Sequence, residues 1–162
     1  MFYKSTILVI IFLSLFCTTQ SLAGELNACD LITKETVEKS SGLIITNVTS
    51  KDRGVFTSCT YDTDNWKDSI GLIYHPGGKT DKDSAALATE LQEEFEHDEA
   101  PYKKPEPVTG LGDAAAYYQS ADGGFHAIVV LKSGASISGR LVVSAPTRQA
   151  ALAVAKAVFA DK

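Results

Sequence analysis

Two cysteines constrain the fold of this chain more than any other residues. The sequence holds three cysteines, and the first, Cys17, lies in an apolar N-terminal stretch that we interpret as an export signal. The other two, Cys29 and Cys59, would enter an oxidising compartment, where a single pair most simply forms one disulfide. Such a bond stabilises a fold by about 3–4 kcal/mol in the chain-entropy model. The number and spacing of the cysteines exclude a Cys-x-x-Cys redox motif and a zinc-binding set.

The N-terminal residues 1–23 have the three parts of a secretory signal peptide. Lys4 supplies the positive charge, residues 7–16 form a short apolar stretch, and residues 21–23 (SLA) match a small-residue cleavage site. The apolar stretch is too short to span a bilayer, which takes about 20 residues. We therefore expect cleavage after Ala23, a periplasmic or secreted product, and no stable membrane span afterwards.

Two other interpretations of the N-terminus stay open. In the first, Cys17 is the lipidated residue of a lipoprotein; Phe16 disfavours this, because a lipobox has a small residue at that position. In the second, the apolar stretch is an uncleaved anchor.

Residues 24–162 would form the mature chain, and their number is typical of a single domain. Cleavage removes Lys4 and leaves 14 basic and 20 acidic residues, a formal charge of −6. The chain has no cluster of basic residues interleaved with aromatic ones. We therefore expect no nucleic-acid partner.

Hydrophobic periodicity predicts an α+β fold in the order α-β-β-β-α-β-β-β-α. Short strands with tight turns indicate antiparallel meanders, with the helices packed on one face of the sheet. Thr33 is a good cap for the first helix, and Gly42 is a good terminator. The predicted helices cover residues 34–41, 83–99 and 146–162, and the predicted strands cover residues 43–49, 55–62, 68–75, 114–120, 125–132 and 136–144.

One glycine motif has the spacing of a dinucleotide-binding turn, Gly110-x-Gly112-x-x-Ala115. That chemistry needs a strand before the turn and a helix after it. Here the proline-rich residues 100–107 precede the motif and a predicted strand follows it. We therefore expect a structural turn that leads into a strand, and no cofactor.

Several motifs together resemble those of a family of small exported bacterial proteins. They are NACDLITKETVEKSSG (27–42), SCTYD (58–62), VTGLGDAAAYY (108–118), the hairpin at 125–144 and the alanine-rich closing helix. In that family of (lipo)proteins and extracellular sensor-type domains of unknown function, an ACxLLTxxEV helix, a CxY strand and a GLGDxAYY turn recur in this order. The resemblance implies a compact α+β domain with a disulfide, and it supplies no catalytic residues.

The three histidines, His75, His97 and His126, are not spaced as metal ligands. The best local cluster is Glu94, His97 and Asp98, which share one helix face and could hold a divalent ion weakly. A solvated acidic helix end explains the same residues, and we expect no metal. A metal-dependent enzyme that uses His75, His97 or His126 remains an alternative.

Nucleophilic catalysis has little support in the sequence. Residues 132–134 (KSG) match one box of the penicillin-binding serine enzymes, but no Ser-x-x-Lys box accompanies it. No cysteine is left for thiol catalysis once the disulfide forms. We therefore expect a protein that is not an enzyme.

Polar-tipped aromatic residues are plentiful, and such residues are favoured at recognition surfaces. The sequence thus favours an exported, non-enzymatic domain that binds an unknown protein or small ligand. An inhibitor of a periplasmic enzyme is a further alternative. The residues that we expect to contact the ligand are Trp66, Tyr74, Asp113, Tyr117 and Tyr118.

Overall fold

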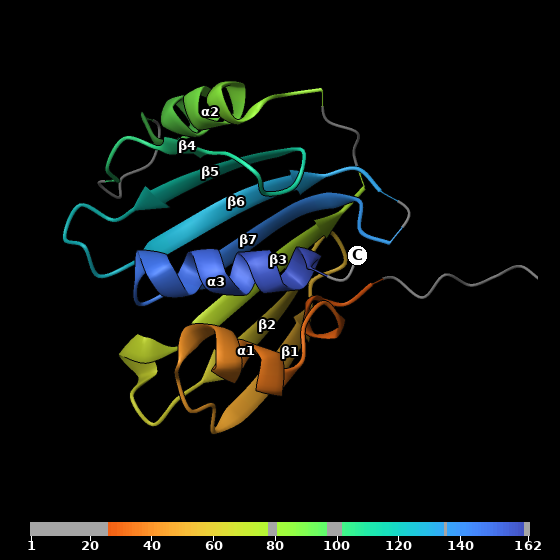
Figure 1. Ribbon diagram of the computed structural model, residues 1–162, viewed down its shortest axis with the longest axis vertical. Helices are drawn as coiled ribbons and strands as arrows, with labels where there is room; N and C mark the ends of the chain where they lie inside the picture. Colours follow the sequence, from red (N-terminus) through yellow and green to blue (C-terminus); the bar gives the residue numbers. More distant parts are fainter. Residues whose placement is uncertain (1–25, 78–80, 97–101, 135, 161–162) are drawn as a thin grey trace, which may run out of the picture.

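The computed structural model describes residues 26–77, 81–96, 102–134 and 136–160, and within them seven antiparallel strands form one sheet (Figure 1). The strand order is β1-β2-β3-β7-β6-β5-β4. The fold is α+β, as the hydrophobic pattern predicts. The strands are β1 (Asn47–Asp52), β2 (Thr57–Asp62), β3 (Ile70–Pro76), β4 (Glu106–Val108), β5 (Ala114–Gln119), β6 (His126–Lys132) and β7 (Gly139–Ala145). The helices are α1 (Lys34–Ser41), α2 (Ser84–Glu96) and α3 (Arg148–Phe159), with short 3-10 turns η1 (Ala28–Asp30) and η2 (Trp66–Asp68).

Two meanders meet at the centre of the sheet. The first contains β1 to β3 and the second β4 to β7, and β7 pairs with β3 to join them. The register places Gly71 of β3 opposite Ser144 of β7. Segments far apart in the sequence therefore lie side by side near the middle of the sheet (Figure 1).

Local signals define helix α1 as predicted. The Thr33 hydroxyl oxygen accepts a hydrogen bond from the Thr36 backbone N–H, and Gly42 ends the helix in the left-handed conformation with φ 75°. Ile32 before the cap and Val37 in the helix are both buried in the same core. These are the two positions of a hydrophobic staple, the arrangement that sets the direction in which a chain enters a helix.

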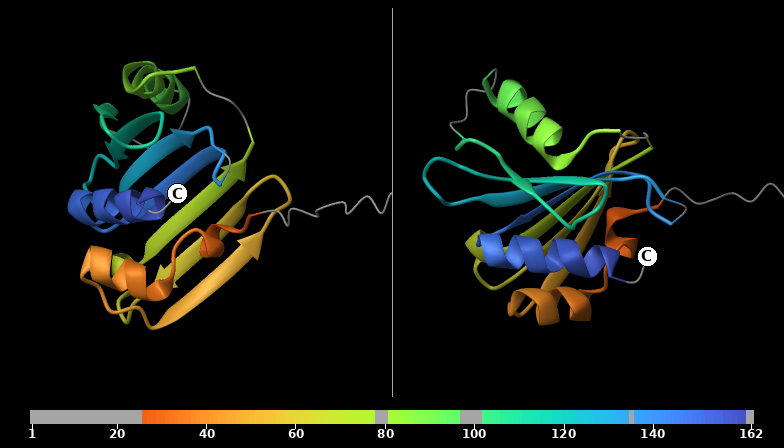
Figure 2. Two further views of the ribbon diagram at one scale, coloured as in Figure 1. Left: turned by 45° about the vertical axis from the view of Figure 1, so that its right-hand side comes forward. Right: turned by 45° about the horizontal axis from the view of Figure 1, so that its top comes forward.

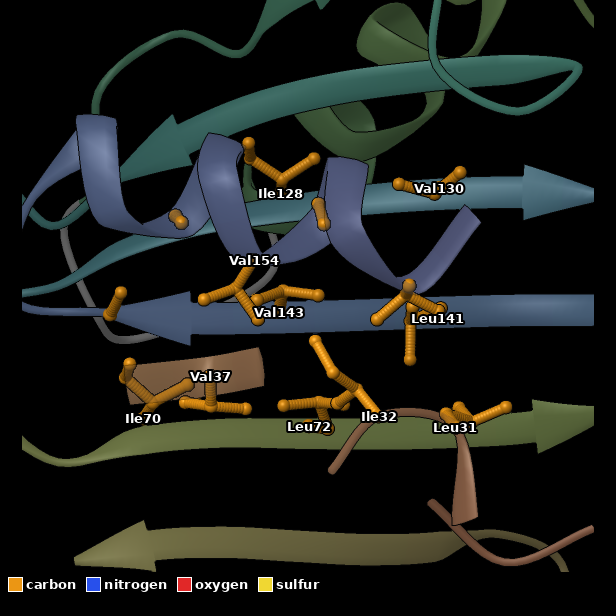
Figure 3. Close-up of a cluster of buried hydrophobic side chains, with 14 of the residues drawn as sticks. Leu31, Ile32, Val37, Ile70, Leu72, Ile128, Val130, Leu141, Val143 and Val154 are labelled. Carbon is orange, nitrogen blue, oxygen red and sulfur yellow. The ribbon is translucent and has the colours of Figure 1, made fainter. Parts of the chain in front are cut away.

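The main core lies between one face of the sheet and helices α1 and α3 (Figure 3). Every second residue of each central strand points into it, because side chains alternate between the faces of a strand. The close-up labels ten of its members: Leu31, Ile32, Val37, Ile70, Leu72, Ile128, Val130, Leu141, Val143 and Val154.

Helix α2 packs against the other face of the sheet, next to β4 and β5 (Figure 2). Leu87 and Leu91 of this helix contact a second cluster that contains Ala116 and Val129. This arrangement differs from the prediction of helices on one face, which holds for α1 and α3. The alanines of β5 leave room for α2 on the second face. Within the described residues, no helix lies over the outward face of β1, β2 and β3 (Figure 2).

Some predicted boundaries also differ. Strand β1 begins at Asn47 rather than at residue 43, and β7 begins at Gly139 rather than at residue 136. The proline-rich crossover contributes the short edge strand β4, which the sequence did not predict. Pro107 is tolerated there because an edge strand does not need every backbone donor.

The predicted disulfide joins Cys29 of η1 to Cys59 of β2. Two hydrogen bonds reinforce this connection: the Ala28 N–H donates to the Thr57 hydroxyl at 2.8 Å, and the Tyr61 hydroxyl donates to the Ile32 carbonyl at 2.6 Å. Burial and then the charge of Asp30 raise the pKa of Tyr61 to about 12, so this hydroxyl stays protonated as a donor. The N-terminal segment is thereby fixed to the sheet.

None of the described helices is long and apolar enough to cross a membrane. The predicted signal peptide, residues 1–23, lies outside the described residues.

Candidate functional site

The glycine motif forms a turn that leads into β5. Gly110 and Gly112 have φ values of 73° and 62°, which glycine adopts without strain. A Cβ on Gly112 would lie 2.6 Å from the carbonyl oxygen of Leu131, so the backbone needs glycine there. Strand β5 follows the turn where a dinucleotide fold would have a helix. The structural interpretation of the motif is confirmed.

Asp113 completes this turn. Its carboxylate accepts a hydrogen bond from the Ser133 backbone N–H at 2.6 Å and pairs with Lys132 at 3.3 Å. The Ser133 hydrogen bond and then the Lys132 contacts hold the pKa of Asp113 below its usual value. The predicted contact residue Asp113 thus links the start of β5 to the β6–β7 turn, which also contains the KSG sequence.

Two of the predicted contact tyrosines face the main core. The Tyr74 hydroxyl donates to the Ser138 carbonyl at 2.8 Å, and the Tyr74 side chain is buried. Tyr117 is also buried, with its hydroxyl 2.7 Å from His126 Nδ1 and 2.6 Å from the Gln119 side-chain oxygen. Burial raises the pKa of Tyr117. Both hydroxyls are thus occupied inside the protein.

Tyr118 points to the opposite face of β5, as alternation predicts, and joins an aromatic cluster. Its ring centroid lies 4.8 Å from that of Phe95, 5.5 Å from that of Tyr102 and 6.1 Å from that of Phe125. Burial, the first of several causes, raises the pKa of Tyr118 to about 12. The cluster attaches α2 to β5 and extends to the β5–β6 turn.

The described histidines do not form a common site. His75 pairs with Arg140 at the start of β7, and His126 pairs with Ala145 at its end, about 17 Å apart along the strand. They also lie on opposite faces, because His126 shares the face of buried Ala145 while His75 follows buried Tyr74. His97 lies outside the described residues. Among the described residues, no group of three histidine, cysteine or acidic side chains could hold a metal ion.

One groove does bring several exposed side chains together. It lies between η2 and the β5–β6 turn, which are both at the left-hand end of the sheet in Figure 1. Its volume is about 580 Å³. The lining residues are Trp66, Lys67, Ser69, Ser120, Asp122, Gly124, Phe125, Ser144 and Ala145.

The turn η2 presents Trp66 to solvent on one side of the groove. The Asn65 side-chain oxygen accepts a hydrogen bond from the Lys67 N–H, and its amide group donates to Asp68 at 2.8 Å. These bonds fix the short turn between β2 and β3. The Trp66 side chain is 79% exposed, and the Lys67 ammonium lies 5.7 Å from the centre of its ring.

The β5–β6 turn holds Phe125 on the other side. The Ser120 hydroxyl donates to the Asp122 carboxylate and accepts from the Phe125 N–H at 3.1 Å. Asp122 also accepts from the Gly124 N–H at 2.9 Å. The Ser120 hydrogen bond, followed by that of Gly124, lowers the pKa of Asp122. The turn therefore places one ionised carboxylate and one exposed aromatic ring at the groove.

Small residues form the floor. Ser144 of β7 lines the groove, and its register partner in β3 is Gly71. On the other side of Ser144, the partner in β6 is Ala127. Because none of these side chains is bulky, the sheet surface is low between the two aromatic walls.

Of the five predicted contact residues, Trp66 lines the groove and Tyr118 lies beside its wall at Phe125. Asp113, Tyr74 and Tyr117 lie elsewhere. Asp122, Phe125 and Ser144, which also line the groove, are not among the residues that the sequence predicts. The available signal was Phe125 itself, an aromatic residue directly after the turn sequence ADGG.

No family model matches the chain, and neither a curated protein nor a solved structure matches it.

Proposed function

We propose that this chain is an exported, non-enzymatic domain that binds its ligand or partner in the groove between η2 and the β5–β6 turn. The observation that carries the proposal is the placement of Trp66 and Phe125 on either side of a floor of small residues. Aromatic rings held in a concavity with a few polar groups are typical of binding sites.

The rigidity of both walls supports a binding role. Side-chain hydrogen bonds within η2 and within the β5–β6 turn fix the backbones that carry Trp66 and Phe125. A preformed site loses less conformational entropy when it binds than a flexible one. The Trp66 ring is 79% exposed and borders the groove, so it is available to contact a ligand.

The chemistry of the groove supports a non-enzymatic role. Its lining residues include serines, one lysine and one aspartate, and they include neither histidine nor cysteine. Ser69 donates to the Asp62 carboxylate at 3.4 Å, and Ser120 donates to the Asp122 carboxylate, whose pKa is lowered. Ser144 donates to the Gly71 carbonyl at 3.3 Å, and in the described hydrogen bonds none of the three serines contacts a histidine or a lysine. A nucleophile needs an adjacent base that can take its proton.

Two features support export. The leader sequence has the parts of a signal peptide, and the mature part carries the Cys29–Cys59 disulfide, a bond typical of oxidising compartments. The resemblance to small exported bacterial proteins agrees with both.

The test is to isolate the protein from its native compartment and to measure bound mass by native mass spectrometry. We expect a ligand or partner on the wild-type protein and its loss from a Trp66→Ala, Phe125→Ala double variant that keeps its fold. Val55→Ala is the matched control, because Val55 is 75% exposed just before the start of β2 and does not line the groove. If all three proteins retain the ligand or partner equally, the proposal is contradicted. If the bound partner is an enzyme, this protein is an inhibitor of that enzyme.

A further inference from the structure

We infer that the ligand of this groove is a neutral saccharide, with a ring face of the sugar against Trp66 and Phe125. The inference rests on the proposed function, because it concerns the same groove. Three properties of the lining point to this ligand class: exposed flat rings, several hydroxyls and balanced charge.

The aromatic walls suit the faces of a sugar ring. A pyranose ring carries axial C–H groups on its faces and hydroxyls around its rim, so one ligand has an apolar face and a polar edge. Trp66 offers the larger flat surface, and Phe125 is 37% exposed. The face of an aromatic ring is electron-rich and attracts the weakly positive C–H groups.

The polar residues suit the rim of the ring. Ser69, Ser120 and Ser144 line the groove. Their hydroxyls donate within the protein, to Asp62, Asp122 and the Gly71 carbonyl, and each oxygen keeps a lone pair that can accept a hydrogen bond from a ligand. The Asp122 carboxylate accepts hydrogen bonds, and bonds to an ionised acceptor are stronger than neutral ones. Sugar hydroxyls can donate hydrogen bonds to these acceptors without a charge of their own.

The charge and openness of the groove favour a neutral ligand with some polar groups. Among the described lining residues, only Lys67 and Asp122 are charged, and their opposite charges disfavour a strongly anionic or cationic ligand. The groove is open to solvent on the sheet surface, whereas a purely apolar ligand requires an enclosed cavity to bury its surface. A volume of about 580 Å³ accommodates one or two sugar rings.

Trp66 provides the experiment, because it is the only tryptophan of the chain. Its fluorescence and its indole N–H signal in a ¹H–¹⁵N spectrum report on the groove alone. The purified mature protein is titrated with maltose, cellobiose and N,N′-diacetylchitobiose. Sorbitol is the control ligand, since it has the hydroxyls and lacks the ring face.

We expect saturable shifts of the Trp66 indole and of the backbone amides of residues 120–125 with at least one disaccharide, and none with sorbitol. The same amides then report on variants. Trp66→Ala should weaken binding by about tenfold or more, Trp66→Phe by less, and Val55→Ala not at all.

The saccharide inference is overturned if none of the disaccharides gives a saturable shift, if sorbitol acts equally, or if Trp66→Ala binds as tightly as the wild type. If a peptide or another molecule shifts the Trp66 indole signal and the disaccharides do not, the saccharide inference is wrong, and the groove remains the proposed binding site. Ligand retention that is independent of Trp66 and Phe125 would overturn both proposals.

Discussion

The hydroxyl oxygen of Ser144 occupies the space that a side chain on Gly71 would need. A Cβ built on Gly71 would lie 2.6 Å from this oxygen, which itself contacts the Gly71 carbonyl at 3.3 Å. The two residues face each other where β3 meets β7, 73 positions apart in the sequence. This small pair keeps the floor of the groove low.

Filling the floor should abolish binding without unfolding the protein. In a Gly71→Val, Ser144→Ala double variant, the second change removes the clashing hydroxyl and the first adds a β-branched residue that favours strands. We expect a free energy of unfolding within about 1 kcal/mol of the wild type in urea denaturation, and no bound ligand by native mass spectrometry. Ile73→Val on the same face of β3 is the control, and undiminished binding by the double variant would show that the floor is not the contact surface.

The two glycines of the GLGD turn should differ in their tolerance of alanine. Both have positive φ, but a Cβ on Gly110 meets open space, whereas one on Gly112 would meet Val130 and the carbonyl of Leu131. We expect Gly110→Ala to cost about 1 kcal/mol and Gly112→Ala to cost more than about 2 kcal/mol of unfolding free energy. Chemical denaturation of the matched pair measures this, and equal costs would argue against the close approach of the turn to β6.

The Cys29–Cys59 bond should provide a large share of the stability. It closes a loop with a sequence separation of 30 residues, for which the chain-entropy model gives about 3–4 kcal/mol. We expect that thiol-specific reagents find no reactive group in the native mature protein, and that a Cys29→Ser, Cys59→Ser double variant loses about this free energy in urea. Two reactive thiols in protein from its own compartment would contradict both the bond and export.

His75 should make the fold less stable on mild acidification. Burial, and then the nearby charge of Arg140, lowers the pKa of His75 from its usual value of 6.5. Between the two pKa values the unfolded chain therefore binds more protons than the folded chain. The free energy of unfolding falls as the pH drops from about 6.5 toward the folded-state pKa.

The check is the urea midpoint of the wild type and of His75→Gln, followed across this pH range. We expect the urea midpoint of the wild type to fall relative to that of His75→Gln as the pH falls. Parallel curves would show that His75 titrates alike in the folded and unfolded chains.

Local signals explain what could be predicted from the sequence. Helix α1 matches its predicted bounds because the Thr33 cap and the left-handed Gly42 act within one turn of the chain. The cysteine pair was predictable because the third cysteine, Cys17, lies in the predicted signal peptide. Strand β1 was misplaced because Ile45, in a stretch of strand-favouring residues, instead packs in the core and donates its N–H to the Glu38 carboxylate at 2.9 Å.

The groove was only partly predictable, because its walls come from separate meanders. The chemistry of Trp66 predicts a contact residue, and the structure places this residue in the lining of the groove. Its proximity to Phe125 depends on the pairing of β3 with β7, which joins the two meanders and has no local signal in the sequence. The positions of Tyr74 and Tyr117 in the core depend on the same long-range register.

The proposed contact surface is the groove between Trp66 and Phe125. Its most direct test is the Trp66 indole signal in ¹H–¹⁵N spectra after a low-molecular-weight extract of the native compartment is added. We expect this signal to shift in the wild-type protein and to stay unmoved in the Gly71→Val, Ser144→Ala variant. A signal that stays unmoved in the wild type, or that shifts equally in both proteins, would contradict the claim.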